Sequence, residues 1–133
     1  MENHKYHILI VEDDKEIRDG VEIYLKNQGY QVWKAANGKE GLEIVAQEEI
    51  HLAILDIMMP VMDGLTAART IRDLERQDAK TIPIIAMTAN AFREDAERCM
   101  EAGMNAHLAK PLDDEKIKQT ISEELRKQNA CHE

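Results

Sequence analysis

The sequence has few of the features that mark secreted, membrane-spanning or nucleic-acid-binding proteins. No run of about 18 apolar residues could cross a bilayer, and residues 1–10 lack the basic start and apolar stretch of a signal peptide. The 26 Asp and Glu residues outnumber the 17 Lys and Arg, which form no basic run with interleaved aromatics. These absences predict a cytoplasmic protein that has no membrane partner and no direct nucleic-acid partner.

Motifs for disulfides, histidine-bound metals and nucleotides are absent too. The two cysteines, Cys99 and Cys131, have no metal-like spacing and no disulfide framework. We expect Cys99 to be buried on a helix and Cys131 to lie in a polar tail. The five histidines show no close ligand spacing, and neither a Walker loop nor G-x-G-x-x-G occurs. A histidine metal site and a glycine-rich phosphate loop are therefore disfavoured.

Short apolar runs predict strands that are covered on both faces. They read HILIV at 7–11, LAIL at 52–55 and IPIIAM at 82–87, and they are too short for helices and unbroken rather than alternating. Two weaker strands are expected at 30–35 and 105–110. Unbroken apolar strands are typical of a parallel sheet.

Helical patterns separate these runs, with a glycine or a capping residue at several ends. The expected helices lie after Asp14, after Asn37, from about 64 to 76, around Phe92–Met100 and around Ile117–Leu125. Alternating strands and helices predict an α/β fold, a doubly wound parallel sheet of five strands with five helices, in a single domain spanning 1–133 with a core of about 7–127. The first residues and the tail after about Lys127 are expected to be loose.

Acidic side chains stand at the carboxyl ends of two predicted strands, where doubly wound folds bind their ligands. The first strand ends in Glu12, Asp13 and Asp14, and the third ends in Asp56. Carboxylates packed together repel one another, and the usual relief is a hard divalent cation. Magnesium fits this donor set, because it keeps several waters and recruits phosphate oxygens. The sequence therefore predicts a magnesium site at this edge.

The other two strand ends would add a hydroxyl, Thr88, and an ammonium group, Lys110. A carboxylate can attack a phosphoryl group when a metal and a cation neutralise its equatorial oxygens. Taken singly, Asp13 and Asp14 could merely cap a helix, an interaction of about 1 kcal/mol, and Asp56 could be a turn residue. Their joint placement at four strand ends favours phosphoryl transfer onto Asp56.

Four motifs in order, ILIVEDD, LAILDIMMPVMDG, IIAMTANA and HLAKPL, resemble the receiver domain of two-component response regulators. The resemblance covers residues 7 to about 127. It implies a flavodoxin-like sheet of order 2-1-3-4-5, and it implies that Asp56 accepts a phosphoryl group from a sensor histidine kinase or a histidine phosphotransfer protein. By the same resemblance, Glu12 and Asp13 hold Mg²⁺ together with Asp56 and the backbone carbonyl of Met58.

The resemblance also assigns the residues of a conformational switch. Thr88 would move toward the phosphoryl group and Lys110 would pair with it, while His107 stands where the family often has Tyr or Phe. A histidine there permits a pH-dependent coupling, or it is simply a half-exposed residue of an edge strand. Phosphorylation would shift the population between two conformations, and a downstream effector would read the change at the last two helices, about 91–127.

Two other functions remain as alternatives. A magnesium-dependent phosphatase with an aspartyl-phosphate intermediate would carry a second Asp two positions after the nucleophile, where Met58 stands. An inactive receiver, used as an interaction module, would have lost the acceptor, a metal residue or the lysine. The leading prediction is a signalling phosphoacceptor rather than an enzyme, with only self-phosphorylation from small phosphodonors and autodephosphorylation expected. The motifs are compatible with a stand-alone regulator and with a domain cut from a longer protein.

Overall fold

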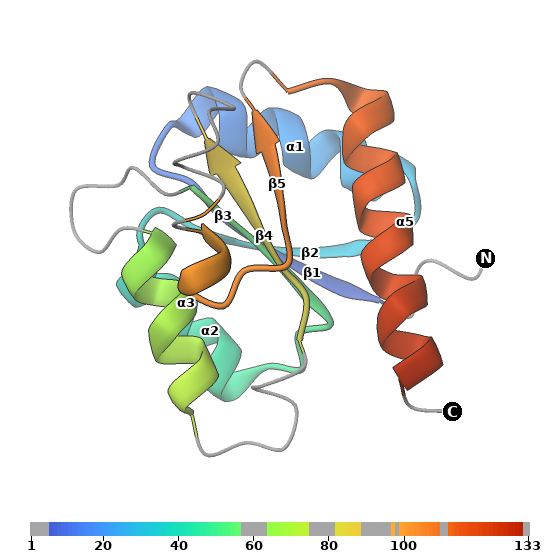
Figure 1. The fold of residues 1–133 in the computed structure, drawn as a ribbon. Helices are drawn as coiled ribbons and strands as arrows, with labels where there is room; N and C mark the ends of the chain where they lie inside the picture. The colour runs from blue at the N-terminus through green and yellow to red at the C-terminus, as the bar shows by residue number, and fades with distance from the viewer. Residues whose placement is uncertain are drawn as a thin grey trace.

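The computed structural model describes residues 6–56, 64–74, 82–88, 97, 99–109 and 112–131. Its centre is a five-stranded sheet of order β2-β1-β3-β4-β5 in which every neighbouring pair is parallel (Figure 1). The strands are β1 His7–Val11, β2 Gln31–Ala35, β3 Leu52–Asp56, β4 Ile84–Thr88 and β5 Ala106–Ala109. The labelled helices are α1 Lys15–Asn27, α2 Gly38–Gln47, α3 Gly64–Asp73 and α5 Asp114–Cys131. The predicted doubly wound sheet and its order are confirmed.

Helices cover both faces of the sheet, which explains why its central strands are apolar throughout. All five residues of β3 and of β4 are buried. Side chains alternate between two cores, as the period of a strand requires. From β1, Leu9 and Val11 enter the core beneath α2 and α3, whereas Ile8 and Ile10 enter the core beneath α1 and α5 (Figure 1). A strand of this kind cannot carry polar side chains until it leaves the sheet.

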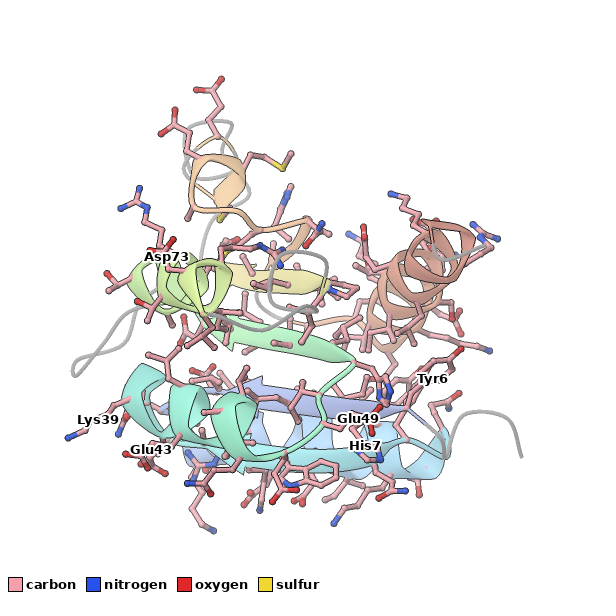
Figure 2. All side chains as sticks on the ribbon, turned by 90° about the horizontal axis from the view of Figure 1, so that it is seen from below. Tyr6, His7, Lys39, Glu43, Glu49 and Asp73 are labelled. Atoms are coloured by element: carbon pink, nitrogen blue, oxygen red, sulfur yellow. The ribbon has the colours of Figure 1, made fainter. Side chains whose placement is uncertain are left out.

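The amino-terminal end of the sheet is closed by two histidines. The backbone N–H of His7 donates to Nδ1 of His51 at 2.9 Å, and the backbone N–H of His51 donates to the carbonyl oxygen of His7 at 2.8 Å. The His7 ring contacts the carbonyl oxygen of Glu49 through Nδ1 at 2.7 Å, and Figure 2 shows His7, Glu49 and Tyr6 gathered at this end. These residues stabilise the end of β1 opposite to Glu12.

Several predicted boundaries differ from the structure. The tail after Lys127 was expected to be loose, but α5 continues to Cys131. Its last turns are rich in good helix formers, and adding a residue to an existing helix is far easier than nucleating one. Strand β4 begins at Ile84 rather than at 82, because Pro83 has no N–H to give to a ladder. Cys99 is buried as predicted.

The helix predicted around Phe92–Met100 lies largely outside the described residues, although residues 97 and 99–101 are helical. The first five residues are outside them as well. Within the described ranges, no helix is both long enough and apolar enough to span a membrane.

Candidate functional site

The carboxyl ends of β1 and β3 lie side by side because these strands are neighbours in the sheet. Val11 pairs with Leu55 in the parallel register, so the next residues, Glu12 and Asp56, leave the sheet together. The chain runs from β1 to β2 on one side and later enters β3 on the other, which makes this point the reversal of strand order where such folds bind ligands. The sequence alone predicted both residues here.

Three carboxylates meet at this edge. Glu12, Asp13 and Asp56 each offer an oxygen, and these oxygens lie within 4.8 Å of one another. Glu12 is 0% exposed and Asp56 is 3% exposed, while Asp13 is open to solvent. Three hard oxygen donors with one open side fit a magnesium ion, which binds through a few carboxylates and keeps waters for exchange. Met58, whose carbonyl was predicted as a further ligand, lies outside the described residues.

The hydroxyl of Thr88 lies on the next strand. Asp56 pairs with Met87 of β4, and Thr88 is the last residue of that strand. Its side chain is buried, and its Oγ1 has no hydrogen-bond partner within the described part of the chain. A buried polar atom left in this way costs about 1–3 kcal/mol. Such an atom is typical of a functional group that awaits a ligand.

Strand β5 brings the remaining predicted residues to the same end of the sheet. Ala109, its last residue, pairs with Thr88, and Lys110 follows directly but is outside the described residues. His107 lies on β5 at the edge of the sheet, and its side chain is exposed. The sequence placed both residues on this strand, and their roles in switching stay predictions.

Comparison with known proteins identifies the family. Residues 8–122 match the family model of the response regulator receiver domain. The chain belongs to this family. It is 40% identical over 120 residues to the regulatory protein VanR of Enterococcus faecium, covering 90% of this chain and 50% of VanR. It is 36% identical over 121 residues to the sensor histidine kinase RcsC of Escherichia coli K12, covering 91% of this chain and 12% of RcsC.

A solved receiver domain has the same fold. The receiver domain of sensor histidine kinase PA1611 from Pseudomonas aeruginosa PAO1, with magnesium coordinated in its active-site cleft, superposes with a TM-score of 0.82 at 33% identity. The match covers 90% of this chain and 97% of that one. Receiver domains are signalling phosphoacceptors rather than classical enzymes, they bind magnesium at an acidic pocket, and they pair with histidine kinases and effectors. Family membership does not favour the phosphatase or the inactive module.

Asp14 of the receiver caps a helix. Its Oδ1 accepts hydrogen bonds from the backbone N–H groups of Glu16 at 2.9 Å and Ile17 at 3.3 Å, at the start of α1. The sequence had left capping open for both Asp13 and Asp14. The structure gives the cap to Asp14 and brings Asp13 to the carboxylate cluster.

This division of labour predicts opposite effects for two neighbouring alanine substitutions. Asp14→Ala should lower the free energy of unfolding by about 1 kcal/mol, because it removes the cap. Asp13→Ala should leave stability within about 0.5 kcal/mol of wild type in EDTA, because an exposed carboxylate among others contributes little. Urea unfolding of both variants in EDTA measures the difference, and a larger loss in Asp13→Ala would contradict the assignment.

Arg18 is a neighbour of the site that the sequence did not reveal. Its Nη1 donates to the backbone carbonyl oxygen of Glu12 at 2.7 Å, and its side chain is partly buried. The available signal was its place one turn into α1, since long helical side chains lean back toward the helix N-terminus.

Proposed function

We propose that this receiver domain, residues 1–133 with a core of about 7–127, accepts a phosphoryl group on Asp56 in a magnesium-dependent reaction and relays a two-component signal. The observation that carries the proposal is the approach of the Glu12, Asp13 and Asp56 carboxylate oxygens to within 4.8 Å of one another at the reversal of strand order. A buried Thr88 hydroxyl on the adjacent strand supports it.

In the proposed reaction, Asp56 is the nucleophile. One of its carboxylate oxygens forms a bond to phosphorus while the P–N bond of a donor phosphohistidine breaks and leaves its electron pair on the imidazole nitrogen. Magnesium held by Glu12, Asp13, Asp56 and the carbonyl of Met58 would neutralise charge on the phosphoryl oxygens. The near-complete burial of Asp56 limits the access of water from the core side.

The switch would act through the residues next to the phosphoryl group. The Thr88 hydroxyl would gain a hydrogen bond to a phosphoryl oxygen, and Lys110 would pair with a second oxygen. Both interactions exist only in the phosphorylated state, so they shift the population toward the conformation that makes them. His107, next to Leu108 on β5, would carry this change to a downstream effector that reads the surface of about 91–127.

The partners follow from the family. The chain spans about half of VanR and a smaller share of RcsC, a regulatory protein and a sensor histidine kinase. We propose that the donor is a sensor histidine kinase or a histidine phosphotransfer protein in the cytoplasm. The excess of 26 acidic over 17 basic residues argues against direct contact with nucleic acid or an anionic membrane.

Incubation with acetyl phosphate tests this proposal without knowledge of the natural kinase. With Mg²⁺, intact-mass measurement should find one phosphoryl adduct that hydroxylamine removes, as expected for an acyl phosphate. With EDTA in place of Mg²⁺, the adduct should be lost. An adduct that forms equally well in EDTA, or one that resists hydroxylamine, would contradict the proposal.

A further inference from the structure

The acidic segment that follows β1 has its backbone anchored on both sides of Asp13. The N–H of Glu12 donates to the carbonyl oxygen of Ala35 on β2 at 3.1 Å, and its own carbonyl oxygen accepts from Nη1 of Arg18 at 2.7 Å. Two residues later, the carbonyl oxygen of Asp14 accepts from the backbone N–H of Arg18 at 2.9 Å. Arg18 therefore contacts the segment on either side of Asp13, once through its side chain and once through its backbone.

The guanidinium bond acts on the peptide group that joins Glu12 to Asp13. A peptide group is planar, so the carbonyl of Glu12 and the N–H of Asp13 turn together. The orientation of that plane sets ψ of Glu12 and φ of Asp13, and with them the directions of both side chains. A bond from a charged donor at 2.7 Å is roughly twice as strong as a neutral one. Arg18 thus restrains the torsion angles that aim two of the three carboxylates.

We propose that Arg18 is a positioning residue for the magnesium site, which holds the peptide between Glu12 and Asp13 so that both carboxylates face one cation. This inference rests on the proposed function, since it assumes that the Glu12, Asp13 and Asp56 cluster binds Mg²⁺. Magnesium demands near-ideal octahedral geometry, so a small rotation of its ligands weakens binding. Groups behind the ligands of a metal typically change its affinity by about 10–100-fold.

The charge of Arg18 has an opposite effect, and the sign of the result separates the two. A nearby cation repels Mg²⁺, so loss of the charge alone would tighten magnesium binding. Loss of the hydrogen bond would loosen it. The Arg18 side chain is only partly buried, so solvent screens its charge, and its donor group is bonded to a carbonyl oxygen. The loss of positioning therefore exceeds the relief of repulsion.

Calorimetric titration of the full chain with Mg²⁺, without a phosphodonor, tests the inference. Arg18→Met should raise the Kd for Mg²⁺ about tenfold. Arg18→Lys retains the charge and one possible donor but lacks the planar fork, and it should raise the Kd about threefold. Arg126→Met is the matched control, because it removes the same charge from an exposed position on α5 and should leave the Kd unchanged.

The outcomes also separate this inference from the proposed function. If wild type binds Mg²⁺ and Arg18→Met binds it as well or better, positioning is overturned while the magnesium site stands. If wild type does not bind Mg²⁺, the proposed function fails and this inference fails with it. Urea unfolding in EDTA shows whether each variant is folded. Should Arg18→Met be unfolded, Arg18→Lys decides the question, since an unchanged Kd in that variant overturns the inference.

Discussion

Asp56→Asn should abolish phosphorylation by acetyl phosphate, with at least a 100-fold lower yield of adduct than wild type. An amide nitrogen and oxygen replace the carboxylate, so the nucleophile is lost while the shape of the side chain is kept. The variant should fold as well as wild type in EDTA or slightly better, because one of three carboxylates within 4.8 Å of one another becomes neutral. Intact mass after a fixed incubation measures the first effect, and urea unfolding measures the second.

Asp73→Asn is the matched control for this substitution. Asp73 is exposed on α3 (Figure 2), and the same chemical change there should leave the yield of adduct unaltered. A full adduct on Asp56→Asn would show that another side chain accepts the phosphoryl group. A loss in both variants would point to a general effect of charge instead of a nucleophile.

Arg72→Met should lower the free energy of unfolding by about 3 kcal/mol, the range of a hydrogen-bonded charge whose partners are partly buried. The guanidinium joins three segments: Nε and Nη2 donate to the carbonyl oxygen of Gly103 at 3.0 and 2.6 Å, and Nη1 donates to that of Ile82 at 2.7 Å. Nη2 also donates to Oδ1 of Asn105 at 2.8 Å, which in turn accepts from the backbone N–H of Ile84 at 2.9 Å. Methionine would fill similar space and leave these acceptors without the donor.

Arg69→Met provides the comparison for Arg72. Arg69 is exposed on the same helix, so its loss should change stability by no more than about 0.5 kcal/mol. Burial lowers the pKa of Arg72 from its ordinary value, but an arginine stays protonated in proteins, so the difference should persist across neutral pH. Urea unfolding at constant pH measures both variants, and equal losses would show that the network around Arg72 does not stabilise the fold.

Much of the fold could be predicted because two simple rules govern it. The unbroken apolar runs at 7–11 and 52–55 leave no polar face, so they require helices on both sides of the sheet. Once strands are parallel, their carboxyl ends meet at one edge, and residues at those ends become neighbours without any knowledge of side-chain packing. Glu12, Asp56 and Thr88 were found in this way.

Contacts made to backbone atoms could not be predicted, because any residue offers a carbonyl oxygen. The Arg18 contact with Glu12 and the Arg72 contact with Gly103 depend on where two distant segments come to lie. The separate roles of Asp13 and Asp14 had a similar cause. Which of two adjacent carboxylates caps a helix depends on a backbone torsion, here the extended ψ of 113° at Asp14, and residue type does not fix it.

The position of the phosphoryl group itself gives the most direct test. Borohydride reduces an aspartyl phosphate to homoserine, so the chain phosphorylated with acetyl phosphate and Mg²⁺ can be reduced, digested and sequenced by mass spectrometry. We predict homoserine in place of Asp56, and unaltered aspartate at positions 13 and 14. Homoserine at either of those positions, or at no position, would contradict phosphoryl transfer onto Asp56.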